Sequence, residues 1–169
     1  MDFRDIPQFP RAHYTIDIEW RRLARFLAED CEGLDLNPDY QRAHVWTEEQ
    51  KRAYVEYILK GGDVARTVIV NAPKWEPHGY EGATLVDGKQ RLSAILDFME
   101  NRLPIFGGNR YCDFTGWIRT VNARVQWSVV ILPTRAELLQ LYLNINAGGT
   151  PHAPEEINRV RELLAKELE

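Results

Sequence analysis

Hydrophobic positions follow a helical period in some parts of the chain and form short β-branched runs in others, which predicts both helices and strands. Apolar residues at helical spacing predict amphipathic helices over 16–29, from Thr47 to the Gly61-Gly62 pair, from Lys89 onward, over 135–142 and from Pro154 onward. Continuous or β-branched apolar runs predict strands over 66–72, up to Asp87 and over 125–132, with a short candidate at 34–37. Because helices and strands alternate irregularly, we expect an α+β fold, with a small mixed β-sheet packed by helices.

Length and composition narrow the picture to one domain. A chain of 169 residues with 44% hydrophobic content can bury one core, so we expect a single compact domain over 1–169. Cys31 and Cys112 are too few for a disulfide framework and no charged-then-apolar leader opens the chain, which together predict a cytoplasmic protein. No apolar run approaches the roughly 18 residues that cross a bilayer, so we expect no membrane partner. The net charge of -4 argues against strong non-specific binding to duplex DNA.

The strongest candidates for functional residues lie where the strand ending at Asp87 turns through Gly88 into the next helix. Gly88 can adopt backbone angles that are closed to other residues, and the amides of Lys89, Gln90 and Arg91 open the helix without intrahelical partners. The helix dipole favours an anion at this end, and a guanidinium offers phosphate two parallel donors. Asp87 leaves the strand where a metal ligand or a general base is placed. The junction therefore predicts a phosphate site.

Two other blocks accompany this junction. Residues 36–46 read Leu-Asn-Pro-Asp-Tyr-Gln-Arg-Ala-His-Val-Trp, and residues 141–151 read Leu-Tyr-Leu-Asn-Ile-Asn-Ala-Gly-Gly-Thr-Pro. In order and spacing, the three blocks resemble the Asp-Gly-Gln-Gln-Arg branch of the ParB/sulfiredoxin-like superfamily, which forms the N-terminal domain of GmrSD-type modification-dependent restriction proteins. Lys89 replaces the first Gln of that motif, and Asn144 stands where many members have Arg. The resemblance covers residues 12–165, which we take as the core of the domain.

The resemblance implies a nucleoside triphosphate, ATP, GTP or CTP, as substrate, with Mg²⁺ bridging its phosphates. We expect an enzyme that transfers a phosphoryl group to water or to a hydroxyl, in a phage or bacterial DNA modification or restriction context. Its other partners would be DNA, a DNA-modifying protein or a nuclease. The implied catalytic residues are Asp87 and Arg91, with Asp87 also the metal ligand. The implied nucleotide-binding residues are Arg42, Gly88, Lys89, Gln90, Arg91, Asn144 and Asn146.

Each of these residues also has a purely structural explanation. Asp87 can be an ordinary helix N-cap, Arg91 a surface ion pair, and Asn144 and Asn146 partners of backbone groups before the last helix. Trp46 is expected to pack in the core. A non-catalytic module that binds a nucleotide or DNA is therefore the main alternative, and a metal-dependent nuclease is a third. The chain contains no P-loop motif, which excludes a P-loop kinase or ATPase.

Overall fold

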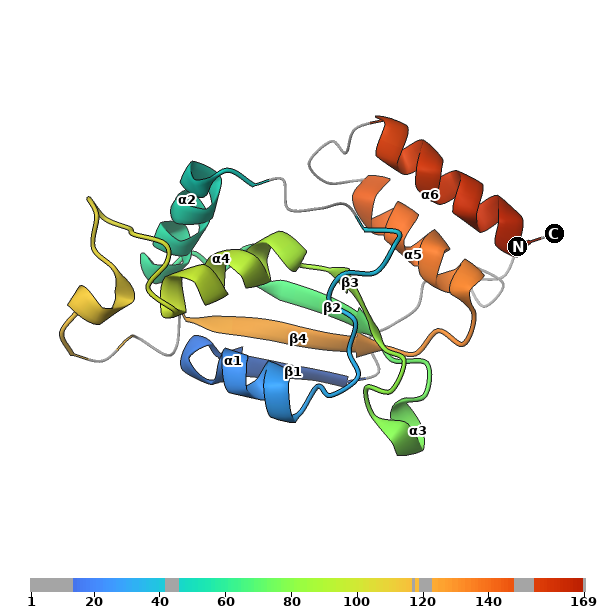
Figure 1. The fold of residues 1–169 in the computed structure, drawn as a ribbon, viewed down its shortest axis with the longest axis horizontal. Coiled ribbons are helices and arrows are strands. Elements are labelled where there is room, and N and C mark those ends of the chain that lie inside the picture. Colours follow the sequence, from blue (N-terminus) through green and yellow to red (C-terminus); the bar gives the residue numbers. More distant parts are fainter. Residues whose placement is uncertain (1–13, 42–45, 117, 119–122, 148–153, 169) are drawn as a thin grey trace, which may run out of the picture.

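Four strands form one mixed β-sheet in the order β1-β4-β2-β3 (Figure 1). The structure is a computed structural model that describes residues 14–41, 46–116, 118, 123–147 and 154–168. The strands are β1 (Tyr14–Glu19), β2 (Thr67–Asn71), β3 (Thr84–Asp87) and β4 (Arg124–Val130). β2 and β4 are parallel at the centre, whereas β1 pairs antiparallel with β4 and β3 antiparallel with β2. β1 and β3 are thus the two edges of the sheet.

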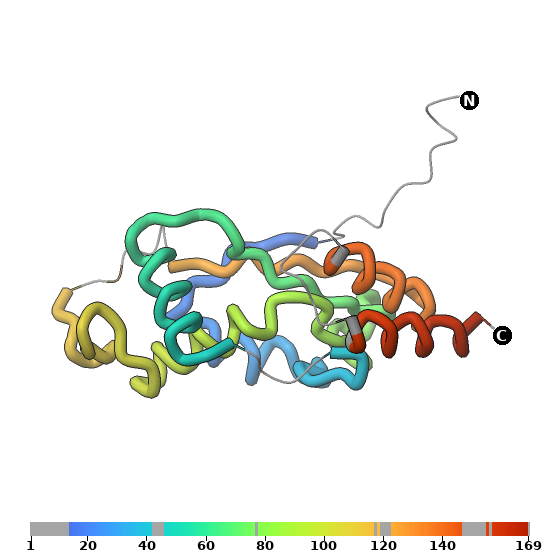
Figure 2. Tube along the Cα trace, turned by 90° about the horizontal axis from the view of Figure 1, so that it is seen from above, coloured from blue at the N-terminus to red at the C-terminus, as the bar shows by residue number. Residues whose placement is uncertain are grey.

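Helices cover the sheet in two groups. α1 (Trp20–Glu29), α2 (Glu48–Leu59) and α4 (Lys89–Met99) lie on one side of the strands (Figure 2) and enclose the larger core. α5 (Arg135–Ala147) and α6 (Pro154–Glu167) pack on each other and form a second, smaller core with β3 and the end of β4. A short helix, α3 (Trp75–His78), and a 3-10 turn, η2 (Tyr111–Asp113), lie in connecting segments. The arrangement confirms the expected α+β fold with a small mixed sheet.

Strand β3 joins the two cores because its side chains alternate between the two faces of the sheet. Leu85 belongs to the larger core and Val86 to the smaller one, and each is only 1% exposed. Burial on both faces explains why this strand reads as a continuous apolar run. The Asp87 end of β3 is therefore held from both sides, which fixes the start of α4.

The first predicted helix is wrong over residues 16–19, which belong to strand β1. Ile16 pairs with Trp127 of β4, and Ile18 pairs with Val125. Ile16 and Trp20 are four residues apart, so the apolar pattern suits a helix, but together with Ile18 it suits a strand equally well. Pairing with a strand more than a hundred residues away decides between them, and α1 begins only at Trp20.

Other predicted elements need smaller corrections. The strand candidate at 34–37 is reduced to a single parallel bridge between Asp35 and Thr84, because Pro38 follows. The segment between the strands predicted over 66–72 and up to Asp87 contains α3 and the buried residue Tyr80. The helix predicted over 135–142 continues to Ala147. The helix predicted from Thr47 begins with a capping box, in which the Thr47 hydroxyl accepts the Gln50 amide and the Gln50 side chain accepts the Thr47 amide.

Gly88 is required at the turn between β3 and α4 for two reasons. Its φ of +102° lies in the left-handed region that side chains disfavour. A Cβ at this position would also lie 2.8 Å from Cγ2 of Val68 and 3.1 Å from its Cα, so the turn passes directly over β2. The close approach seats the first turn of α4 on the centre of the sheet.

We predict that Gly88→Ala lowers the free energy of unfolding by about 2–4 kcal/mol, since left-handed strain of about 1–2 kcal/mol adds to a steric overlap of similar size. Gly82→Ala is the matched control, because Gly82 also has a positive φ, +70°, but its Cβ would meet nothing within 4 Å. Urea denaturation of both variants measures the difference. Equal losses would show that the contact with Val68 does not contribute.

Candidate anion-binding site

Asp87 and Arg91 form an ion pair across the turn that begins α4. Nη2 of Arg91 donates to Oδ2 of Asp87, one helical turn back. The Arg91 side chain is 19% exposed and that of Asp87 33%, so both groups are partly shielded yet open to a ligand. Nε of Arg91 is buried and has no hydrogen-bond partner in the described part of the chain. A guanidinium with unused donors at a helix N-terminus is suited to bind an anion.

Tyr54 of α2 lies beside this pair and was missed by the sequence analysis. Its hydroxyl donates to the carbonyl of Ala65 at 3.1 Å. Burial raises the pKa of Tyr54 to about 12, although the charges of Arg91 and Arg66 oppose the shift. The phenol is therefore neutral at physiological pH, and the charge of Arg91 acts on its hydroxyl. The helical spacing of Tyr54 indicated only a buried position, and nothing local indicated this neighbour.

Gln90 connects the segment before α2 to the start of α4. Its side-chain oxygen accepts the backbone N–H of Trp46 at 3.3 Å. The Trp46 ring is half-buried, packs against the larger core and lies 5.4 Å from the ring of Tyr54. This confirms the expectation that Trp46 is a core residue. Gln90 thus has a structural contact in the ligand-free chain, in addition to its predicted role at a phosphate.

Lys89 points away from Arg91, because residues two apart on a helix do not face each other. It lines a separate pocket with a volume of about 400 Å³, together with Lys51 of α2 and Asp97 of α4. Burial lowers the pKa of Lys89, and the charge of Asp35 opposes the shift. Because the two residues are two positions apart, the sequence alone could have predicted that their side chains point in different directions. The predicted contact of Lys89 with phosphate stays a prediction.

Residues 40 and 41, in the block over 36–46, contact β3. The Tyr40 hydroxyl donates to the carbonyl of Leu85 at 2.8 Å, and Nε2 of Gln41 donates to the same oxygen at 2.6 Å. Burial raises the pKa of Tyr40, so its hydroxyl remains a donor. Both side chains therefore hold this block two residues before Asp87. Arg42 itself lies outside the described residues, so its predicted phosphate contact stays a prediction.

The third block lies on α5. Nδ2 of Asn146 donates to the carbonyl of Tyr142 at 2.7 Å, and Oδ1 of Asn144 accepts from Gln140 at 3.0 Å. Both contacts fall within α5, but only that of Asn146 is to a backbone group, whereas Asn144 contacts a side chain. The predicted nucleotide contacts of both residues stay predictions. The pair Gly148-Gly149 lies outside the described residues. That all three blocks meet in one pocket therefore stays a prediction.

These features define an α+β domain with a paired carboxylate and guanidinium at a strand-to-helix turn, a site suited to anions. Residues 23–126, more than half of the chain, match the family model described as GmrSD restriction endonuclease, N-terminal domain. The chain belongs to this family, which confirms the resemblance to GmrSD-type proteins and places the domain in a restriction context. No curated protein matches the chain.

Two further observations concern possible partners. Among the described residues, no three His, Cys, Asp or Glu side chains gather as a protein-only metal site requires. No helix in the described ranges has the length and apolarity needed to cross a membrane.

Asp97 anchors α4 to α2 through Lys51, whose Nζ donates to Oδ2 of Asp97 at 2.7 Å and to Oγ of Ser93 at 2.8 Å. Arg102 donates to the other carboxylate oxygen at 2.7 Å. Burial pushes the pKa of Asp97 up, but the hydrogen bonds from Lys51 and Arg102 outweigh it, so this pKa lies below its usual value. The charged carboxylate therefore stabilises the packing that brings Tyr54 to Arg91.

We predict that Asp97→Asn lowers the free energy of unfolding by about 1–2 kcal/mol at pH 7, because charge-assisted hydrogen bonds are lost at a partly exposed site. A depressed pKa contributes stability above the unfolded-state value of about 3.9, and this stability is lost as the pH falls further. The difference between wild type and variant should therefore shrink below about pH 4. Urea denaturation at several pH values measures it, and a difference independent of pH would contradict this role of Asp97.

Proposed function

We propose that this domain binds a nucleoside triphosphate with Mg²⁺ at the Asp87–Arg91 turn and transfers its terminal phosphoryl group. The observation that carries the proposal is the Arg91 guanidinium, which is partly buried at the N-terminus of α4 and has an unused Nε donor. Phosphate binding at such a position uses the helix dipole, the free amides of the first turn and the guanidinium together. Membership of the restriction family supports a nucleotide-dependent step in DNA restriction.

Asp87 is suited to bind Mg²⁺ or to act as the general base in the proposed phosphoryl transfer. Its carboxylate is one-third exposed and has an oxygen beyond the one that pairs with Arg91. Mg²⁺ commonly binds through one or two carboxylates together with substrate phosphates, so a cluster of protein ligands is not needed. Asp87 would hold this ion, which would neutralise phosphate charge. The same carboxylate can instead accept the proton of the attacking water or hydroxyl, while the bond from the terminal phosphorus to the bridging oxygen breaks.

A ligand changes the balance of charge in the pair. Without phosphate, Asp87 and Arg91 neutralise each other across the turn. An incoming triphosphate supplies several negative oxygens, so Arg91 can turn its remaining donors to them while Asp87 is drawn toward the cation. Phosphate and Mg²⁺ should therefore support each other's binding, because each relieves the repulsion that the other would meet.

The first test measures nucleotide binding by calorimetry with ATP, GTP and CTP in the presence of Mg²⁺. Arg91→Ala should weaken the bound nucleotide about tenfold or more, in line with a charge-assisted contact of about 1.5–3 kcal/mol. Arg25→Ala is the matched control, because Arg25 also pairs with a carboxylate one helical turn away, Glu29, but on the exposed face of α1. Unchanged affinity in Arg91→Ala would remove Arg91 from the site. No binding of any triphosphate by the wild type would reject the proposal.

The second test separates an enzyme from a binding module. Asp87→Asn keeps the shape and an acceptor for Arg91, so the fold should survive, and saturating Mg²⁺ and triphosphate offset the loss of affinity that follows from a weaker Mg²⁺ site. If Asp87 takes part in catalysis, release of phosphate should fall about a hundredfold or more with Mg²⁺ saturating. Phosphate release equal to that of the wild type would favour the non-catalytic module, in which Asp87 only pairs with Arg91; the N-cap of α4 is Gly88 and not Asp87.

A further inference from the structure

Strand β1 leaves one edge of the sheet open. Among the described residues, the strand that pairs with β1 is β4, on one side only. In an antiparallel pair every second residue turns its backbone N–H and C=O away from the partner strand. These outward groups are a template for another extended segment.

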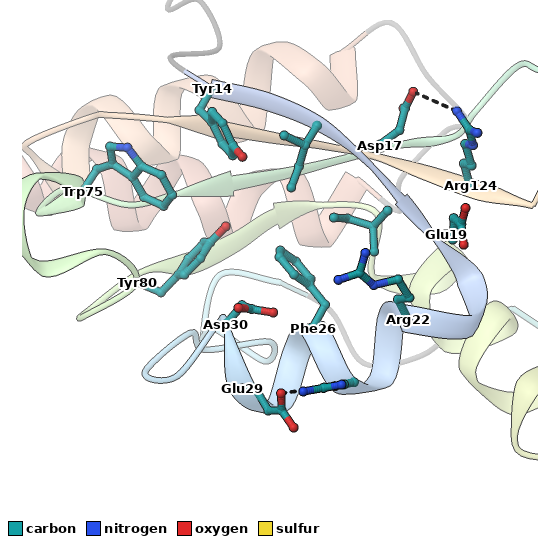
Figure 3. A pocket seen from close by; sticks show the side chains of 13 residues that line it. Tyr14, Asp17, Glu19, Arg22, Phe26, Glu29, Asp30, Trp75, Tyr80 and Arg124 are labelled. Atoms are coloured by element: carbon teal, nitrogen blue, oxygen red, sulfur yellow. Dashed lines mark hydrogen bonds and ion pairs between the residues drawn. The ribbon is translucent and has the colours of Figure 1, made fainter. Parts of the chain in front are cut away.

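A groove runs along this open edge, between β1 and α1 (Figure 3). Its volume is about 790 Å³. Ile16 and Ile18 line it from one face of β1, and Asp17 and Glu19 line it from the other. Because residues of both faces border the same hollow, the groove reaches around the edge of the strand. The outward backbone groups of β1 are therefore accessible from it.

Helix α1 and its C-cap residue, Asp30, present a row of three different side chains to this groove. Arg22, Phe26 and Asp30 follow one another at intervals of four residues, and Figure 3 shows them along the side of α1 that faces β1. Neither Arg22 nor the carboxylate of Asp30 has a hydrogen-bond or ion-pair partner in the described ranges. By contrast, Arg25 pairs with Glu29 at 2.6 Å. The row thus offers an unpaired cation, an aromatic ring and an unpaired anion, in that order.

The spacing of this row matches an extended chain. Four residues of helix advance about 6 Å, and side chains on one face of a strand repeat about every 6.8 Å. Three alternate side chains of a strand added to β1 would therefore lie opposite Arg22, Phe26 and Asp30.

We propose that this groove binds an extended peptide segment of a partner protein, which adds to β1 as a further strand. An acidic side chain of the segment lies opposite Arg22, an apolar one opposite Phe26 and a basic one opposite Asp30. The peptide backbone supplies affinity through β1, and the row on α1 supplies specificity.

Aromatic rings at one end of the groove support a basic residue there. The rings of Tyr14 and Trp75 are stacked with centroids 5.5 Å apart, and Tyr80 packs edge-on against Trp75 at 5.2 Å. Figure 3 places Tyr80 above Asp30 at this end. A Lys or Arg side chain can lay its apolar stem on such rings while its charge reaches a carboxylate.

The charges of the groove favour a peptide over nucleic acid. Its lining includes four carboxylates, those of Asp17, Glu19, Glu29 and Asp30, against three arginines. Phosphates of a DNA strand would meet net repulsion, whereas a segment that carries both an acid and a base matches both unpaired groups.

The test uses fluorescent peptides with alternating threonines around the core Glu-Thr-Val-Thr-Lys, and the reversed core Lys-Thr-Val-Thr-Glu, because the strand direction is open. Peptides with Glu or Lys at both charged positions are the mismatched controls. Anisotropy should show one of the mixed peptides binding about fivefold or more tighter than both controls, as matched charges favour the right partner. Two further peptides carry N-methyl groups on alternate amides, one on the odd-numbered positions and the other on the even-numbered positions. Only one set of amides faces β1, so one of the two peptides should lose binding and the other should keep it.

Charge reversal identifies the groove. Arg22→Glu should switch the preference to the Lys/Lys peptide, and Asp30→Lys should switch it to the Glu/Glu peptide. Circular dichroism checks that both variants fold, and both should bind Mg²⁺-nucleotide as the wild type does, so failure here is distinct from failure of the proposed nucleotide site.

Three outcomes would overturn the proposal: no peptide binds, the variants do not change the preference, or neither of the two N-methylated peptides binds more weakly than the unmethylated one. Binding of a single-stranded DNA oligonucleotide that Arg22→Glu abolishes would also overturn it, by making the groove a nucleic-acid site.

Discussion

The organisation of this domain depends on one close approach, where the backbone of Gly88 crosses β2 at Val68. The crossing has no room for a side chain, so it sets how near the first turn of α4 lies to the sheet. Asp87 is the last residue before this turn and Arg91 lies one helical turn after it. The backbone therefore fixes the separation of Asp87 and Arg91. It also keeps the Arg91 guanidinium close to the sheet, where its charge acts on Tyr54 of α2. A looser turn would let Arg91 move toward solvent and weaken any dry contact with an anion.

Local signals predicted the parts of the fold that depend on local chemistry. The Asp87-Gly88 turn and the start of a helix at Thr47 depend only on neighbouring residues, and both are present. The helical stretch over 16–19 was wrong, because Ile16 fits two periods and the pairing of β1 with β4 chooses between them. No sequence pattern identifies a partner more than a hundred residues away. Contacts of this long-range kind also decide which side chains surround a site.

The candidate site shows the same division. The Asp87–Arg91 pair follows from an interval of four residues on a helix, and sequence reasoning found both residues. Tyr54 and the hydrogen bonds from Tyr40 and Gln41 to Leu85 were not found, because each joins segments that meet only in the folded chain. The role of Lys89 was assigned from its place in the motif. The direction of its side chain depends instead on its position around the helix, two residues before Arg91. Motif position and side-chain direction are separate pieces of information.

The two edges of the sheet are not equivalent. At the β3 edge, Asp35 exchanges backbone hydrogen bonds of 2.9 Å with Ala83 and Leu85, and Tyr40 and Gln41 occupy the Leu85 carbonyl. The chain thus covers this edge with its own residues 35–41, while β1 has no such cover in the described ranges. A sheet with one covered edge can be lengthened in a single direction only. Two copies that met through β1 would form a closed pair, and open-ended polymerisation through this sheet is blocked.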